Sequence, residues 1–113
     1  GNNVTKNIPD GGTAGAIIRE VSSAFNATVN DRILADTSTA GFIITLPANG
    51  TLLQNDTIQI IDIGNAMATN NLTVARNLSK INGLTEDLVI NVSGSVITLT
   101  YTGSNYGWVI AGS

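Results

Sequence analysis

The stretch LVINVSGSVITLTYTGSNYGWVI, residues 88–110, decides the fold class of this chain. Apolar side chains recur at every second position in residues 88–92, 97–101 and 106–110. Successive residues of a β-strand point to opposite sides, so each run places these side chains on one face of a sheet. Turn formers separate the runs, first Ser93-Gly94 and then residues 102–105. The stretch therefore predicts a three-stranded antiparallel meander.

The rest of the chain is also divided into short apolar stretches, separated by turn formers such as Asn49-Gly50 and Asn82-Gly83. No segment of ten or more residues shows the 3.6-residue period of an amphipathic helix. Further strands are expected at residues 16–21, 25–29, 32–36, 42–46, 57–63 and 72–75. Eight or nine short strands predict an all-β fold, either an antiparallel β-sandwich or a small barrel.

The run TIQIIDI, Thr57 to Ile63, is apolar on both faces. Such a run predicts a central strand that is covered on each side. Residues 1–15 contain turn formers without any period, and we expect them to form a flexible N-terminal arm or linker. Residues 16–113 are then expected to form a single β-sandwich domain.

The amino-acid composition argues against most kinds of catalytic and metal-binding site. The 113 residues include no His and no Cys, whereas 14 Ile, 8 Val and 14 Thr supply good strand formers. Imidazole and thiolate are the usual transition-metal ligands and nucleophilic or basic groups, so we expect no metal, no cofactor and no catalytic residue. The five cations are scattered and the net charge is −3, which argues against nucleic-acid binding. No apolar run is long enough for a membrane span, and the lack of Cys fits synthesis in a reducing cytoplasm.

An enzyme would have to rely on the eight carboxylates. A glycosidase needs two of them within about 5–9.5 Å. Asp56 and Asp62 are about 20 Å apart if both belong to one strand. Asp31 and Asp36 point to opposite faces if the stretch between them is extended. The carboxylates of residues 86–87 diverge if the pair lies in a strand, and they are solvated if it lies in a turn. A pair formed across strands stays open, but the favoured interpretation is that the protein is not an enzyme.

Asp62 stands among isoleucines, which leaves two interpretations of its carboxyl group. One is a desolvated acid with a raised pKa at a functional site. The favoured one is a carboxylate that accepts hydrogen bonds from backbone N–H groups or pairs with an arginine. Arg32 and Arg76 are the candidate partners, because each lies in a strand-like stretch.

Tyr106 and Trp108 are predicted to share one face of the last strand with Ile110. As a functional patch they would stack on a sugar ring or contact a partner protein, and they are the candidate contact residues. The favoured interpretation is that they fill the core where the last hairpin closes.

Residues 28–110 contain a series of short motifs, each of which occurs once. They are an Asp-Arg-x-x-x-Asp-Thr strand, a Thr-Leu-Pro turn, an Asn-Asp-Thr-Ile strand, a Leu-Thr-Val-x-Arg-Asn segment, an Ile-x-Gly-x-x-Glu-Asp-Leu turn and a final Tyr-Gly-Trp hairpin. This set resembles a β-module of virion structural proteins from tailed bacteriophages. The matching positions are Asp31, Arg32, Asp36, Thr37, Thr45, Leu46, Pro47, Asp56, Thr57, Arg76, Asn77, Ile81, Gly83, Glu86, Asp87, Leu88, Tyr106, Gly107 and Trp108.

The resemblance implies a non-enzymatic structural role in the virion, commonly as a homotrimer in tail fibres, whiskers or capsid decorations. It assigns no binding residues, and residues 1–27 fall outside it. A compact domain with a short arm favours a capsid decoration, or cement, protein that contacts other virion proteins. If the chain is a fragment, a tail-fibre or baseplate module that binds host-surface glycan is the better expectation.

Overall fold

The computed structural model describes residues 16–112, in which it places nine β-strands and one 3₁₀ turn, η1 (Asn49–Thr51). The strands are β2 (Ile17–Val21), β3 (Phe25–Asn26), β4 (Asp31–Ala35), β5 (Phe42–Thr45), β6 (Thr57–Asp62), β7 (Leu72–Ala75), β8 (Leu88–Ile90), β9 (Val96–Tyr101) and β10 (Trp108–Gly112). These strands confirm the all-β prediction. The predicted arm at residues 1–15 lies outside the described residues.

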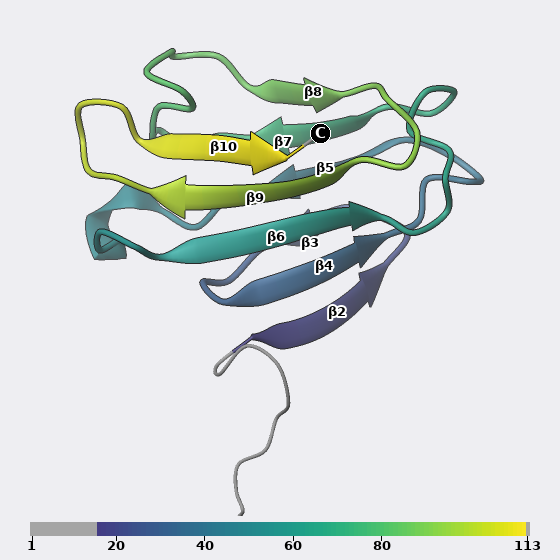
Figure 1. Cartoon of the computed structure of the whole chain (residues 1–113), viewed down its shortest axis with the longest axis horizontal. Helices are drawn as coiled ribbons and strands as arrows, with labels where there is room; N and C mark the ends of the chain where they lie inside the picture. The colour runs from purple at the N-terminus through teal and green to yellow at the C-terminus, as the bar shows by residue number, and fades with distance from the viewer. Residues whose placement is uncertain (1–15, 113) are drawn as a thin grey trace, which may run out of the picture.

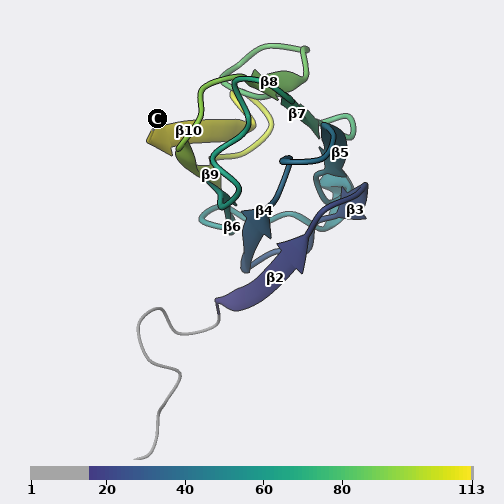
Figure 2. The same ribbon diagram turned by 90° about the vertical axis from the view of Figure 1, so that its right-hand side faces the viewer.

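Two sheets face each other (Figures 1 and 2). One has five strands in the order β10-β9-β6-β4-β2, and the other has four in the order β3-β5-β7-β8. Within residues 16–112 no ladder joins the two sheets, so the body is an unclosed sandwich and not a barrel.

The prediction that the sandwich is antiparallel is wrong. From β2 to β7, each strand lies in the sheet opposite to its predecessor. Because the chain crosses over and comes back, it re-enters each sheet in its earlier direction. The pairs β2–β4, β4–β6, β3–β5 and β5–β7 are therefore parallel. Only β6–β9, β9–β10 and β7–β8 are antiparallel, so both sheets are mixed.

The predicted three-stranded meander is wrong as well. β9 and β10 do form an antiparallel hairpin, with Trp108 opposite Tyr101. β8, however, pairs with β7 in the four-stranded sheet. The turn at Ser93-Gly94 carries the chain from one sheet to the other instead of folding β9 back onto β8. Alternation gave the correct strands there, but it does not specify which strands pair.

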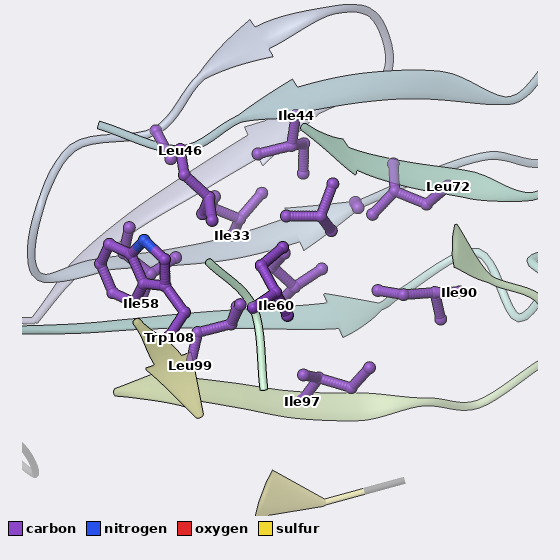
Figure 3. Packing of buried hydrophobic residues seen from close by; sticks show 14 of the residues in the cluster. Ile33, Ile44, Leu46, Ile58, Ile60, Leu72, Ile90, Ile97, Leu99 and Trp108 are labelled. Atoms are coloured by element: carbon purple, nitrogen blue, oxygen red, sulfur yellow. The ribbon is translucent and has the colours of Figure 1, made fainter. Parts of the chain in front are cut away.

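The core fills the space between the two inner faces (Figure 3). Ile33, Ile58 and Leu99 reach it from the five-stranded sheet, and Ile44 and Leu72 reach it from the other sheet. All five are fully buried. Packed aliphatic side chains of this kind supply most of the stabilisation of a chain without disulfides or metal.

β6 is central in its sheet, but only one of its faces is covered. Ile58 and Ile60 point into the core, whereas Ile61 is only partly buried and Ile63 is exposed. The prediction that β6 is a central strand is thus confirmed. The prediction that both of its faces are covered is wrong, because its outer face is not buried. The outer face of β6 carries Ile61 next to the polar residues Thr57 and Gln59. The exposed apolar part of this face is one of the features that a function has to explain.

Candidate functional site

The structure separates the two predicted contact residues. Trp108 opens β10 and is fully buried, with its ring 5.5 Å from that of Tyr101 at an interplanar angle of 65°. Tyr106 lies in the preceding turn with 65% of its surface exposed. The expectation that both share a strand face is wrong because Gly107, at φ 70°, turns the backbone between them. In this fold a ligand has access to Tyr106 but not to Trp108.

Tyr106 is held against the turn at Asn82-Gly83. Its carbonyl accepts a hydrogen bond from the Gly83 N–H at 2.8 Å. A Cβ at Gly83 would lie 3.2 Å from Tyr106 Cδ1, so the ring packs on the glycine backbone. Asn82 and Gly83 both have positive φ, which confirms the predicted turn. The aromatic ring is therefore both fixed and exposed.

Three loops meet at the end of the sandwich where Tyr106 lies, at the left of Figure 1: residues 46–56, 76–87 and 102–107. Long-range hydrogen bonds tie them together. The Asn77 side-chain amide donates to the Leu46 carbonyl at 2.9 Å, and Lys80 Nζ donates to the Asn105 carbonyl at 3.3 Å. We call this region the loop end.

A cleft of about 250 Å³ opens at the loop end. Its lining combines amide, hydroxyl and ammonium groups with the side chains of Leu78 and Tyr101, and also includes Asn49, Ser79, Lys80, Thr85 and Ser104. Small-molecule sites are usually lined mainly by apolar and aromatic side chains, so this cleft is more polar than most of them. We call this the loop-end cleft.

Ser79 is the most unusual residue in the lining of the loop-end cleft. It is only 5% exposed, and its Oγ makes no hydrogen bond within the described part of the chain. Its backbone is fixed, because its N–H donates to the Arg76 carbonyl and its own carbonyl accepts from Arg76 Nη1. A buried hydroxyl without a partner costs about 1–3 kcal/mol. The hydrogen-bonding capacity of this hydroxyl is therefore unused, and its oxygen is enclosed by protein atoms beneath the surface of the cleft.

Leu78, next to Ser79, has a strained backbone. Its φ is 74° and its side chain is 76% exposed. A bulky non-glycine residue in the left-handed region costs about 1–3 kcal/mol, and an exposed leucine gains nothing from burial. Backbone strain of this kind is concentrated at functional sites. Neither Leu78 nor Ser79 was identified from the sequence, where no local signal distinguishes them.

The described aspartates cap turns. Each accepts at least one hydrogen bond from a backbone N–H group, and they are Asp31, Asp36, Asp56, Asp62 and Asp87. Asp31, which is buried, also pairs with Arg19 Nε at 3.2 Å. Within residues 16–112 no group of three His, Cys, Asp or Glu side chains gathers to hold a metal.

The favoured interpretation of Asp62 is confirmed. Its carboxylate accepts hydrogen bonds from the N–H groups of Ala66, Met67 and Gly94 at 3.0–3.2 Å. Arg76 donates to the Ser79 carbonyl instead. Arg32 lies on the other face of the sheet, because it pairs in register with Gln59, three residues before Asp62. Asp62 thus joins the turn after β6 to the turn before β9.

Two acids do line one groove, although not in a catalytic arrangement. Glu20 and Asp36 border an open hollow of about 410 Å³ beside the carboxyl ends of β2 and β4. The Ser38 hydroxyl and then the Ser38 N–H lower the pKa of Asp36 below its usual 3.8. A general acid in glycoside hydrolysis needs a raised pKa. Asp36 is shifted in the wrong direction for that role.

Comparison with protein-family models and with curated proteins found no match to this chain. Within residues 16–112 there is no helix with the length and apolar character needed to cross a bilayer. A functional assignment therefore depends on the geometry of the sandwich itself.

Proposed function

We propose that this chain is a non-enzymatic structural protein of a tailed-bacteriophage virion, a small homotrimeric capsid decoration that binds and stabilises neighbouring virion subunits. Its localisation would be the virion, after synthesis in the cytoplasm of the bacterial host. The resemblance of residues 28–110 supports this proposal. One structural observation supports it further, namely a row of apolar residues on the uncovered outer face of the five-stranded sheet, which also carries polar residues such as Arg32, Gln59 and Thr98.

An apolar row crosses three neighbouring strands on that face. Leu34 of β4 pairs in register with Ile61 of β6, and Ile61 pairs with Val96 of β9. Leu34 and Ile61 are partly buried and Val96 is exposed. Ile18 of β2 and Ile63 in the turn after β6 add exposed apolar surface, and the charged Glu20 of β2 pairs in register with Leu34. We call Leu34, Ile61 and Val96 the outer row.

Parallel strands normally have both faces covered. β2, β4 and β6 are mutually parallel, yet within residues 16–112 nothing covers their outer face. Only 12% of the chain is charged, so little electrostatic repulsion opposes contact between two copies. A second copy of the same chain is the occupant that such a face fits best, since most permanent assemblies are symmetric and bury apolar surface.

Light scattering on the purified protein tests the trimer. The expected mass is three times that of the chain at micromolar concentration, and a monomer contradicts the proposal. Ile61→Lys should dissociate the assembly, because it places a charge in the outer row. Val89→Lys is the matched control, since Val89 is also exposed but lies on the four-stranded sheet. If Ile61→Lys does not fold, Val96→Lys at the rim of the row provides the same test.

Virion location can be tested separately. An antibody against the chain should label the capsid surface of the phage that encodes it in electron micrographs. Labelling of a tail appendage instead would favour the second candidate, a tail-fibre or baseplate module that binds host-surface glycan. The exposed ring of Tyr106 at the loop end is the observation that supports this second candidate. Absence of label from the whole particle would contradict both.

A further inference from the structure

We propose that the free edge of β2 binds residues 2–8 of the same chain, which fold back through a Pro9-Asp10-Gly11 turn and pair with β2 as an additional antiparallel strand. This strand would lie at an edge of the five-stranded sheet, whereas the proposed trimer uses the outer face of that sheet. The added strand goes beyond the proposed function and does not depend on it, so either can fail without the other.

β2 is an edge strand that the described residues leave open. It is the last strand of its sheet, next to β4 (Figure 2), and four of its five residues are exposed. Ile17 is 43% exposed and Ile18 is 62% exposed. Because neighbouring side chains of a strand point to opposite faces, both faces of β2 present apolar surface. An exposed apolar edge of this kind is a template for pairing with a further strand.

The backbone of β2 offers hydrogen-bonding groups at alternate residues. The Ile17 N–H and the Val21 carbonyl each form a hydrogen bond of 2.9 Å with the residues directly before and after β4. The odd-numbered residues of β2 therefore direct their groups toward β4. Since neighbouring residues of a strand point their N–H and C=O groups in opposite directions, Ile18 and Glu20 direct theirs to the free edge. Within residues 16–112 no strand lies there to pair with them.

The other edges of the two sheets are shorter or already covered. β3 has two residues and β8 has three. β10 is as long as β2, but the Trp108 N–H donates to the Lys80 carbonyl and the Trp108 carbonyl accepts from the Asn82 N–H. The Asn82 side chain also accepts from the Ile110 N–H at 3.1 Å. β2 is therefore the longest open edge within residues 16–112.

The sequence before β2 has the composition of a hairpin turn. Pro9-Asp10-Gly11 matches a three-residue loop in which a type I turn is followed by a glycine in the left-handed region. Proline has the φ that the first turn position needs, and it restricts Ile8 before it to extended backbone. Val4, Thr5 and Ile8 are strand formers. The segment therefore contains a candidate strand that a tight turn connects to β2.

A three-residue loop fixes the register of the two strands. Ile8 and Gly12 close the loop as a hydrogen-bonded pair, and hydrogen-bonded pairs then recur at every second residue along both strands. The next such pairs are residues 6 and 14, then 4 and 16, then 2 and 18. The even-numbered residues of β2 would therefore bond to the added strand, and these are the residues whose groups face the free edge.

A four-residue loop does not fit the same edge. It would pair Ile8 with Thr13 and would require the N–H of Ile17, which already donates to the Asn30 carbonyl. In the three-residue register, Val4 lies diagonally from Ile18 on the same face, so its side chain would also cover part of the exposed isoleucine. The composition of the turn and the free backbone groups of β2 thus agree on one register.

Amide hydrogen exchange of the full chain, followed by NMR, tests the added strand. The Ile18 N–H should exchange at least about tenfold more slowly than an unstructured amide, the factor expected for one net hydrogen bond. Val4→Pro should remove this protection, because proline lacks the N–H that would donate to the Ala16 carbonyl. Thr5→Pro is the matched control, since the Thr5 N–H points away from β2 in this register and the protection should remain. An unprotected Ile18 in the parent chain, or equal behaviour of the two variants, would overturn the proposal.

Disulfide trapping identifies the occupant of the edge and its register. The chain contains no cysteine, so the double variant Asn3→Cys, Ile17→Cys adds a single pair. Residues 3 and 17 would face each other with about 4.5 Å between their Cα atoms, within the range of a disulfide. Mild oxidation should form the intrachain disulfide at least about tenfold faster than in the control Asn3→Cys, Ile18→Cys, whose side chains point to opposite faces. Equal rates would indicate a flexible arm, and covalent dimers would show that another copy occupies the edge; either result would contradict the added strand.

Discussion

Asp62 gives the sharpest stability prediction, because its carboxylate connects two separate turns. Oδ1 accepts from the Ala66 N–H at 3.2 Å, and Oδ2 accepts from the Met67 and Gly94 N–H groups at 3.1 and 3.0 Å. The residue is only 6% exposed. The substitution Asp62→Asn keeps the shape of the side chain and removes the charge and one acceptor oxygen.

The cost of Asp62→Asn follows from these three bonds. If the amide oxygen takes the place of Oδ2, the bonds from Met67 and Gly94 survive as neutral ones, and the amide NH₂ then faces the Ala66 N–H. Hydrogen bonds to a charged group contribute about 1.5–3 kcal/mol each, and neutral ones about 1 kcal/mol. The substitution therefore loses one hydrogen bond and weakens two. The uncharged amide offsets part of this free-energy cost, because no charge has to be desolvated when the chain folds. We expect a loss of about 3 kcal/mol in the free energy of unfolding.

Urea unfolding measures this loss directly. Trp108 is the single tryptophan and is fully buried, so its fluorescence reports on the core. With a slope of about 1.5 kcal/mol per molar urea, the midpoint of Asp62→Asn should fall by about 2 M at equal protein concentration. Glu86→Gln is the control, because Glu86 is exposed and the substitution should leave the midpoint nearly unchanged. A midpoint shift for Asp62→Asn no larger than that of the control would refute the structural role of the three bonds.

Two further predictions concern single turns. Gly107→Ala should destabilise by about 3 kcal/mol or more, because the residue has φ 70° and its Cβ would collide with the Lys80 carbonyl. Gly50→Ala, where a Cβ meets nothing, should have little effect in the same melting assay. Ser38→Ala should raise the pKa of Asp36 toward 3.8 in an NMR titration, because the Ser38 hydroxyl is the main group that lowers it. Since that pKa is depressed, the stability contribution of Asp36 is present above pH 3.8 and is lost as the pH falls through the folded-state pKa; an unshifted pKa would contradict the assignment.

The positions of the strands could be predicted from the sequence, whereas their pairing could not. Alternation fixes which side chains face inward, so β7 was located at its observed bounds and β4 within one residue. Partner choice depends on where the chain crosses between the sheets. Ser93-Gly94 has the composition of a hairpin turn, and it serves here as a crossover between β8 and β9. Local turn chemistry does not distinguish these two uses.

The candidate site was predictable only in part. Tyr106 was identified from its residue type, and it is exposed at the loop end. Trp108 was paired with it by counting two residues along a strand, but the strand begins only at Trp108 because Gly107 breaks the alternation. No feature of the sequence distinguishes Ser79 from the other serines. Its burial and its unpartnered hydroxyl arise from three loops that are distant in sequence, and only their arrangement in space reveals them.

The outer row and the exposed ring of Tyr106 lie on separate parts of the surface, so assembly and glycan binding can be tested independently. The outer row lies on the outer face of the five-stranded sheet, whereas Tyr106 lies where three loops meet at one end of the sandwich. A trimer that buries Ile61 would therefore leave Tyr106 accessible. If the chain is a glycan-binding fibre module, Ile61→Lys should yield a monomer that still binds glycan, and Tyr106→Ala should yield a trimer that binds it poorly. Loss of both properties in a single variant that still folds would show that the two surfaces depend on each other, contrary to this separation.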